Sequence, residues 1–441
     1  MTRLALPHPM KGRVPLRRAI LAGVAAAGAV LSCTGAGAQT TTTPPATTTP
    51  TTTPAPAAPT PAAPTPAVAH WYDRINVSGS LETYYDYNTN SPAGRLNQLQ
   101  NWNFHANQFG LPLAELAFQE TPDPVNSPLG FKLVLAYGEA ADWIAGSSAA
   151  EQSYKNIKEA NASYIFSGKS AAPVTVTLGK FVTCCGEEVI ESQNNFNYSH
   201  SLLFTWAIPY YHFGVSASRP FGPKVTATAY LVNGWNNIVD NNNAKTVGYS
   251  LVYNPNPKLS FTTNGFDGAQ NGGERQWAFL TDNILSYTPS NKWTFVGNYD
   301  YGHDWAGAGG TSVHWQGIAG YAHYVIDSKS AGTVRAEVFG DPNGFMIAAP
   351  PFAPVGLVGV SPAFARTPAV TSTVGTVLPV GGGVPQEVKE VTLTYEHKFH
   401  PRITTRWEVR EDWSTADVFS KGTAGLSKTQ TQLIFGNIFT F

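Results

Sequence analysis

Charged side chains are scarce in this chain of 441 residues, since Asp, Glu, Lys and Arg together make up 13% of it. That is about half the share usual in soluble globular domains. The chain also has no uninterrupted apolar run long enough to cross a bilayer as a helix, and its mean hydropathy is −0.15. Its 28 basic and 29 acidic residues leave no basic excess, which argues against a nucleic-acid partner.

Motifs for catalysis and for metal binding are missing as well. No G-x-S-x-G elbow, H-E-x-x-H helix or phosphate-binding loop occurs. His303-Asp304 resembles a fragment of a catalytic triad, but no serine stands out as a nucleophile. Cysteine is limited to Cys33 and the adjacent pair Cys184-Cys185, and no histidine lies near that pair in sequence. The sequence therefore predicts neither an enzyme nor a metal or cofactor site. It leaves open whether the pair forms a disulfide or stays as two thiols.

The N-terminal 69 residues divide into two segments that we expect to lie outside the folded domain. Four basic residues precede an apolar stretch from Ala19 to Leu31, and Ala36-Gly37-Ala38 follows it, so residues 1–38 are predicted to be an export signal. This segment carries five basic residues and no acid, so its removal leaves the mature chain acidic. Residues 39–69 are almost wholly Thr, Pro and Ala, a composition that predicts an extended linker. Residues 70–441 remain for the folded domain.

Alternation of apolar and polar residues dominates the rest of the chain. A strand with lipid on one face and water on the other is expected to alternate in this way, and low charge with abundant Tyr, Trp, Asn, Thr and Gly fits the same picture. The sequence therefore predicts an all-β fold, a transmembrane antiparallel up-and-down barrel of about 16 strands, within a range of 14–18. The clearest apolar rows are Ile75, Val77, Leu81 and Tyr85; Phe131, Leu133, Leu135 and Tyr137; Val391, Leu393 and Tyr395; and Ile403, Thr405, Trp407 and Val409.

The connections between these strands alternate between long loops and short turns, as they do in outer-membrane barrels. With an even strand number, both chain ends then lie on the short-turn, periplasmic side. Pro112 falls inside the second predicted strand and indicates a bulge or a misplaced boundary. The expected long loops are 88–104, 138–154, 183–208, 234–244, 340–385 and 412–427; the expected short turns are 219–223, 254–257, 288–291, 327–330 and 399–401.

The last predicted strand ends on Phe441, with Leu433, Phe435 and Phe439 on the same parity. Its end resembles the C-terminal signal by which outer-membrane barrels are recognised for insertion. Asn437 interrupts the apolar row, and Phe435 stands where that signal usually has a polar residue. Because a closed barrel leaves no edge unpaired, we expect this strand to pair with the first one.

Several motifs between Ser78 and Asn264 resemble the OmpL-like β-barrel porin family. The resemblance implies a porin-like barrel in the bacterial outer membrane and brings no catalytic residues with it. Cys184-Cys185 departs from the expected pattern. The motifs are Gly179-Lys180-Phe181, Glu188-Val189-Ile190-Glu191-Ser192, Asn197-Tyr198-Ser199, Ser201-Leu202-Leu203-Phe204, Ile208-Pro209-Tyr210-Tyr211-His212, Val232-Asn233-Gly234-Trp235, Val239-Asp240-Asn241-Asn242 and the earlier Leu113-Ala114-Glu115-Leu116.

A barrel of sixteen strands is too wide for its wall side chains to fill, which favours a channel for ions and small hydrophilic solutes. The acidic loop from Thr183 to Ile208 is predicted to fold inward and face lumen arginines at a constriction. Two alternatives stay open: the acids lie outside in water while the wall charges neutralise one another, or the barrel is structural or adhesive with a plugged lumen. The residues of the predicted constriction are Glu187, Glu188, Glu191, Arg335, Arg402, Arg406, Glu408 and Arg410.

The expected partners follow from this location. They are outer-membrane lipid and lipopolysaccharide on the outer wall, the barrel assembly machinery during biogenesis, and small hydrophilic solutes in the lumen; the sequence leaves a homo-oligomer open. Aromatic residues near strand ends are expected to form interfacial girdles. These are Trp71, Tyr72, Tyr84, Tyr85, Tyr87, Tyr210, Tyr211, Trp293, Tyr299 and Trp315.

Overall fold

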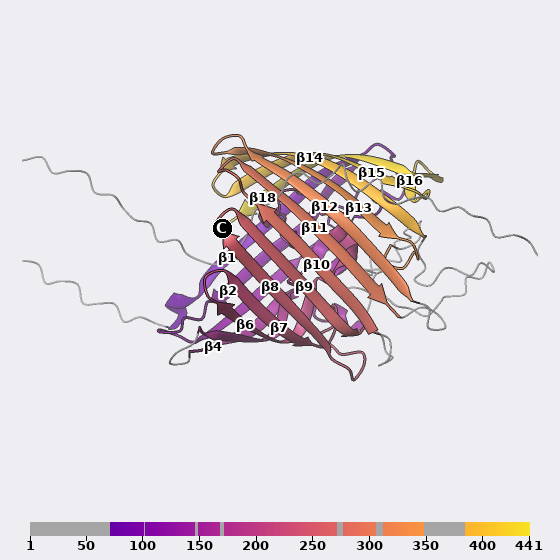
Figure 1. Cartoon of the computed structure of the whole chain (residues 1–441). Coiled ribbons are helices and arrows are strands. Elements are labelled where there is room, and N and C mark those ends of the chain that lie inside the picture. The colour runs from indigo at the N-terminus through magenta and orange to yellow at the C-terminus, as the bar shows by residue number, and fades with distance from the viewer. Residues whose placement is uncertain are drawn as a thin grey trace, which may run out of the picture.

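The computed structural model describes residues 71–100, 102–145, 149–167, 172–270, 277–305, 312–347 and 384–441. Within them, 16 strands form one closed antiparallel barrel, which confirms the predicted fold (Figure 1). The expected export signal, the linker and most of the loop between residues 340 and 385 lie outside the described residues.

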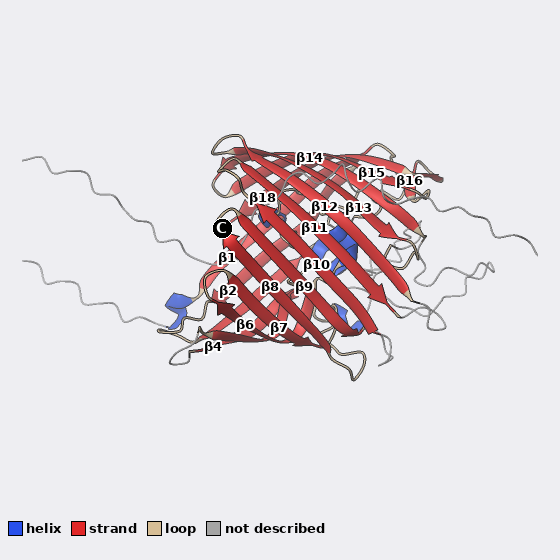
Figure 2. Cartoon of the chain, viewed as in Figure 1, coloured by secondary structure: helices blue, strands red, loops and turns tan. Residues whose placement is uncertain are grey.

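The wall is a continuous meander in which each strand pairs with its neighbours in sequence, and helices are few (Figure 2). No helix among the described residues is long and apolar enough to cross a membrane. The barrel strands are β1 (Asn76–Asn88), β2 (Gln108–Glu120), β3 (Leu129–Tyr137), β4 (Ile157–Phe166), β5 (Val174–Val182), β6 (Tyr211–Phe221), β7 (Val225–Val232), β8 (Thr246–Asn256), β9 (Leu259–Ala269), β10 (Trp277–Tyr287), β11 (Trp293–Asp304), β12 (Val313–Val325), β13 (Ser330–Asp341), β14 (Gln386–His400), β15 (Ile403–Ser414) and β18 (Thr429–Thr440).

The remaining elements are short and belong to the N-terminal end or the loops. A two-stranded hairpin of β16 and β17 stands in the loop between β15 and β18. These elements are η1 (Trp71–Arg74), α1 (Glu139–Ile144), α2 (Ala149–Gln152), η2 (Ser192–Asn194), the π-helix η3 (Leu203–Ala207), β16 (Phe419–Lys421) and β17 (Gly425–Ser427).

The two faces of the wall differ in exposure as the alternation predicts. Along β15, Trp407 and Val409 are 37% and 47% exposed, whereas Arg410, which points to the other face of the same strand, is fully buried. The exposed apolar row faces outward, where a bilayer takes the place of water, and the polar row faces the lumen. Burial by lipid therefore accounts for side chains that would be a liability in a soluble protein.

The barrel closes between its first and last strands, which confirms the predicted pairing. β1 runs antiparallel to β18, and Gly79 and Phe441 exchange backbone hydrogen bonds of 3.2 and 3.1 Å (Figure 1). Asn437 faces outward, yet its side-chain oxygen accepts a hydrogen bond of 2.8 Å from the Thr405 hydroxyl on β15. That bond satisfies the amide and explains how one polar residue fits in an apolar row. Phe435 also faces outward.

Pro112 marks a bulge, one of the two outcomes that its position predicted. Glu82 of β1 pairs with Leu113 of β2, whereas Tyr84 pairs with Gly110, so Leu111 and Pro112 together lie opposite one residue. Proline has no N–H to donate to the ladder, and a bulge removes the need for one.

The expected aromatic girdle holds for only part of its members. Tyr87, Trp293 and Tyr299 are about 40% exposed on the outer face, at 45%, 40% and 39%. The girdle prediction is wrong for four others, which are at most 1% exposed because they pack inside the barrel or under loops. These four are Tyr84, Tyr210, Tyr211 and Trp315.

Candidate functional site: the inward loop and the lumen walls

The loop between β5 and β6, residues 183–210, lies inside the barrel. Every residue from 197 to 212 is buried, although the segment connects two strands and would usually be expected at the surface. A buried loop must find partners for its backbone N–H and C=O groups. Side chains of β13 and β15 supply partners for residues 197–203, and we call β13, β14, β15 and β18 together the arginine wall.

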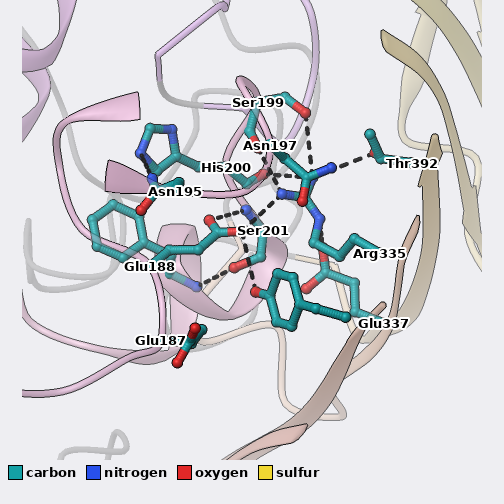
Figure 3. Close-up of polar contacts among 12 residues, drawn as sticks. Glu187, Glu188, Asn195, Asn197, Ser199, His200, Ser201, Arg335, Glu337 and Thr392 are labelled. Atoms are coloured by element: carbon teal, nitrogen blue, oxygen red, sulfur yellow. Dashed lines mark hydrogen bonds and ion pairs between the residues drawn. The ribbon is translucent and has the colours of Figure 1, made fainter. Parts of the chain in front are cut away.

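Arg335 of β13 is the central contact of this wall, and it is fully buried. Its guanidinium donates to Glu188 Oε1 at 2.8 Å and to the carbonyl of Ser199 at 2.6 Å, both in the loop (Figure 3). Its Nε donates to Glu390 of β14 at 3.0 Å. One cation thus joins two strands and two points of the loop, and charge-assisted bonds of this kind are the stronger class of hydrogen bond.

Arg406 and Arg410 of β15 hold the loop through its carbonyls. Arg406 donates to the carbonyls of Ser192 and Asn197 at 2.5 and 2.8 Å. Arg410 donates to the carbonyl of His200 at 2.7 Å. Each arginine also pairs with a carboxylate of the wall, at Glu396 and Asp412 respectively. Both guanidinium groups are therefore neutralised and shielded from water.

Wall carboxylates accept the N–H groups that the same loop segment exposes. Glu408 accepts from the N–H groups of Tyr198 and Ser199 at 2.5 and 2.9 Å. Glu337 accepts from Leu202 and Leu203 at 2.7 and 3.2 Å. Sequence reasoning missed Glu337, although it lies two residues after Arg335 and therefore on the same face of β13.

A small residue in the last strand makes room for the loop. The ring of Tyr198 lies on Gly436 of β18, where an added Cβ would stand 2.2 Å from a ring carbon. Tyr198 also clusters with Tyr84, Ile434 and Ile438, the inward apolar residues of β1 and β18. A side chain at position 436 would displace the ring, so glycine is required there by close approach.

Three residues of the predicted constriction lie elsewhere. Glu191 pairs with Lys158 of β4 and not with an arginine. Figure 3 shows no hydrogen bond or ion pair between Glu187 and the other residues drawn. Glu187 also has no basic partner among the described residues. The prediction that Arg402 faces the lumen is wrong, because β15 begins at Ile403 and Arg402 belongs to the exposed turn before it.

The opposite side of the lumen, formed by β4 to β7, has a different character. Its inward residues include a group of Ser and Thr side chains that stay partly exposed. Ser163 bonds Thr177 across β4 and β5 at 3.0 Å, and Thr228 donates to Ser218 across β7 and β6 at 2.9 Å. We call this surface the hydroxyl wall. The inward loop approaches it at Cys184, which packs with Tyr230 of β7 in the same apolar cluster.

Acidic side chains outnumber basic ones on the lumen side of the described strands. The bases on the lumen side are Lys132, Lys158, Lys180, Arg335, Lys398, Arg406 and Arg410. The inward-facing strand acids are Glu82, Asp86, Glu115, Glu159, Asp282, Asp300, Asp304, Glu337, Asp341, Glu390, Glu396, Glu408 and Asp412, and the inward loop adds Glu187, Glu188 and Glu191. No group of three or more His, Cys, Asp or Glu among the described residues is arranged to hold a metal ion.

A closed barrel of 16 antiparallel strands, with a lipid-facing outer row and a polar lumen entered by the 183–210 loop, defines the class of outer-membrane porin-like barrels. The chain belongs to the family described as "Putative beta-barrel porin-2, OmpL-like", whose model matches residues 74–441. This confirms the resemblance found in the sequence and places the protein in the bacterial outer membrane.

Solved porins share the fold at low sequence identity. The anion-selective porin from Comamonas acidovorans is 12% identical, with a TM-score of 0.50 and coverage of 83% of this chain and 99% of that one. OmpF of Salmonella typhi in complex with daunomycin is 12% identical, with a TM-score of 0.49 and coverage of 84% of this chain and 99% of that one. The outer membrane channel DcaP of Acinetobacter baumannii is 10% identical, with a TM-score of 0.48 and coverage of 83% of this chain and 97% of that one. At such identities the likeness concerns the fold. A search of curated proteins finds no match.

Proposed function

We propose that this porin-family barrel is a passive diffusion channel whose passage follows the hydroxyl wall. The contrast between the two sides of the lumen carries the proposal. Arg335, Arg406 and Arg410 are at most 3% exposed beneath the inward loop, whereas the Ser and Thr side chains of β4 to β7 remain partly exposed. Water and small solutes therefore have access to one side of the lumen and not to the other.

This arrangement differs from the constriction that the sequence suggested. There, loop acids and wall arginines were expected to face each other across water. In the structure Glu188 contacts Arg335 directly, so this pair fastens the loop and does not span an aqueous gap. The loop narrows the lumen from the arginine side, and its free edge borders the hydroxyl wall. Neutral hydroxyls bind ions and sugars weakly, which suits passage of small hydrophilic solutes without trapping them.

The orientation and surroundings of the barrel belong to the same proposal. The short turns, such as residues 222–224 and 401–402, lie at the end that holds the start of β1 and Phe441, and we assign this end to the periplasm. Lipid and lipopolysaccharide would cover the exposed outer row. A porin of Vibrio cholerae with the same fold is described in a trimer form, and cross-linking in native membranes would test a homo-oligomer here.

Planar bilayer recordings test the proposed function directly. Protein purified from outer membranes should give stable single-channel steps, and Thr177→Trp should reduce their size because the indole would stand in the passage. Leu178→Trp is the matched control, since Leu178 is 63% exposed on the outer face. Silence from a folded, heat-modifiable barrel would instead support a structural or adhesive barrel with a plugged lumen.

A further inference from the structure

We infer that this passage prefers cations to anions, because the lumen holds carboxylates that no basic side chain compensates. The inference rests on the proposed function and adds the class of solute to it. It follows from three observations: how the lumen bases are engaged, where the unpaired acids lie, and how close those acids come to the hydroxyl wall.

Every base on the lumen side of the described strands except Lys180 forms an ion pair with a carboxylate, and the buried Lys180 ammonium lies over the ring of Tyr211 at 4.0 Å. Lys132 pairs with Glu159 at 2.6 Å, and Lys158 pairs with Glu115 at 2.7 Å and also with Glu191. The three arginines of the arginine wall pair with wall or loop acids, as described above. Because these bases are paired, and all but Lys132 and Lys398 are buried, they present little positive charge to a passing anion.

Three of the lumen acids that form no ion pair with a base among the described residues lie together. Asp282 of β10 lies directly opposite Asp300 of β11, and the amide of Asn298 donates to both carboxylates, at 2.7 and 3.1 Å. Asn264 of β9, on the other side, donates to Asp282 at 2.7 Å. The third acid is Glu187 of the inward loop, whose backbone N–H donates to Asn298 at 3.0 Å. Asn264 and Asn298 orient the two aspartates, and neither amide supplies a compensating charge.

Glu187 brings this acidic group to the edge of the proposed passage, while Asp282 and Asp300 lie buried in the wall. Glu187 is partly exposed, and Cys184, three residues earlier in the loop, packs with Tyr230 of the hydroxyl wall. Asn264 also donates to the carbonyl of Cys184 at 2.8 Å, which ties the edge of the loop to the same acidic group. Acidic side chains placed at a narrow point of a channel attract cations and repel anions.

The charge of Glu187 should depend on pH. Burial, with Glu188 and Asp282 nearby, raises the pKa of Glu187 to about 8. The other charges facing it do not oppose this effect: Asp300 is a further acid, and Arg335 is engaged by Glu188. The carboxyl is therefore mostly protonated at pH 6 and ionised at pH 9, so the cation preference should rise across that interval.

Reversal potentials across a KCl gradient test the inference with the protein purified from outer membranes. The expected permeability ratio of K⁺ to Cl⁻ exceeds one at pH 6 and is several times larger at pH 9. Glu187→Gln should abolish the increase between the two pH values, and Asp282→Asn should lower the ratio at both. Glu411→Gln is the matched control, because Glu411 lies on the outward row of β15 beside Thr431 and removes the same charge outside the lumen.

The outcomes separate this inference from the proposed function. Absence of conductance overturns the proposed function and the inference with it. Stable conductance with a permeability ratio of one or less at pH 9 overturns the inference alone. A ratio above one that neither Glu187→Gln nor Asp282→Asn changes, or that Glu411→Gln changes equally, overturns the assignment of the preference to this acidic group.

Discussion

Replacing Arg335 by Met should loosen the inward loop while the barrel stays closed. Met preserves much of the volume of the arginine stem but removes the guanidinium. The loop then loses the bonds to Glu188 and to the Ser199 carbonyl, at 2.8 and 2.6 Å. Glu390 stays buried in the wall but loses its hydrogen bond of 3.0 Å from the Arg335 guanidinium.

The magnitude follows from the burial of this network. Arg335 and Glu390 have fully buried side chains, and that of Glu188 is 2% exposed. Removing one partner of a buried ion pair costs about 3–5 kcal/mol, because the remaining charge stays in a poorly solvating site. That free energy corresponds to about two to three and a half powers of ten in the equilibrium between attached and detached loop. Arg406 and Arg410 still hold carbonyls of the loop, so the detachment should be local.

Amide hydrogen exchange measured by mass spectrometry reports this equilibrium. In Arg335→Met, peptides from residues 188–208 should exchange faster by up to about two to three and a half powers of ten. Peptides from the strands should stay as protected as before. Arg402→Met is the matched control, because it removes the same guanidinium group from an exposed turn that does not contact the loop. Unchanged exchange in 188–208, with the variant folded and heat-modifiable, would refute the view that Arg335 holds the loop.

Three further predictions concern the loop edge, its seat and the closing strand. A methanethiosulfonate reagent should lower single-channel conductance by modifying Cys184, and Cys184→Ser should be insensitive; mass spectrometry should find the buried Cys185 unmodified. Gly436→Val should cost about 1–3 kcal/mol by overpacking against Tyr198, seen as a lower temperature for the heat-modifiable shift than in Gly436→Ser. Deleting Phe441 should reduce the yield of folded barrel in outer membranes more than Phe441→Trp does, because the deletion removes backbone bonds at the seam.

The architecture could be predicted from the sequence because lipid and lumen impose opposite demands on neighbouring residues. The row of Trp407 and Val409 against Arg406, Glu408 and Arg410 is visible without any structure, and the exposed fractions repeat it. The alternation of long loops and short turns could also be predicted from the local sequence alone. Aromatic residues were harder to place, because Tyr and Trp suit both an interface and a buried site with a hydrogen-bond partner.

The site was predictable only in part. The inward loop and the inward parity of Arg335, Arg406 and Arg410 follow from local patterns, and the structure places these groups in contact. The partner of each acid does not follow, since the ion pair of Glu191 with Lys158 depends on how β4 stands relative to the loop. Arg402 was misplaced by one residue at a strand boundary, where parity has no meaning because the chain turns.

The position of the loop anchors along the chain sets an order of events during biogenesis. Residues 183–210 precede β13, β15 and β18, yet their backbone groups are satisfied by Glu337 and Glu408, and Tyr198 rests on Gly436. Until β13 and β15 have joined the wall, residues 197–203 lack the side chains that satisfy their backbone groups. Docking of residues 197–203 therefore follows the joining of these strands, and before it the interior is wider and wetter than in the finished barrel.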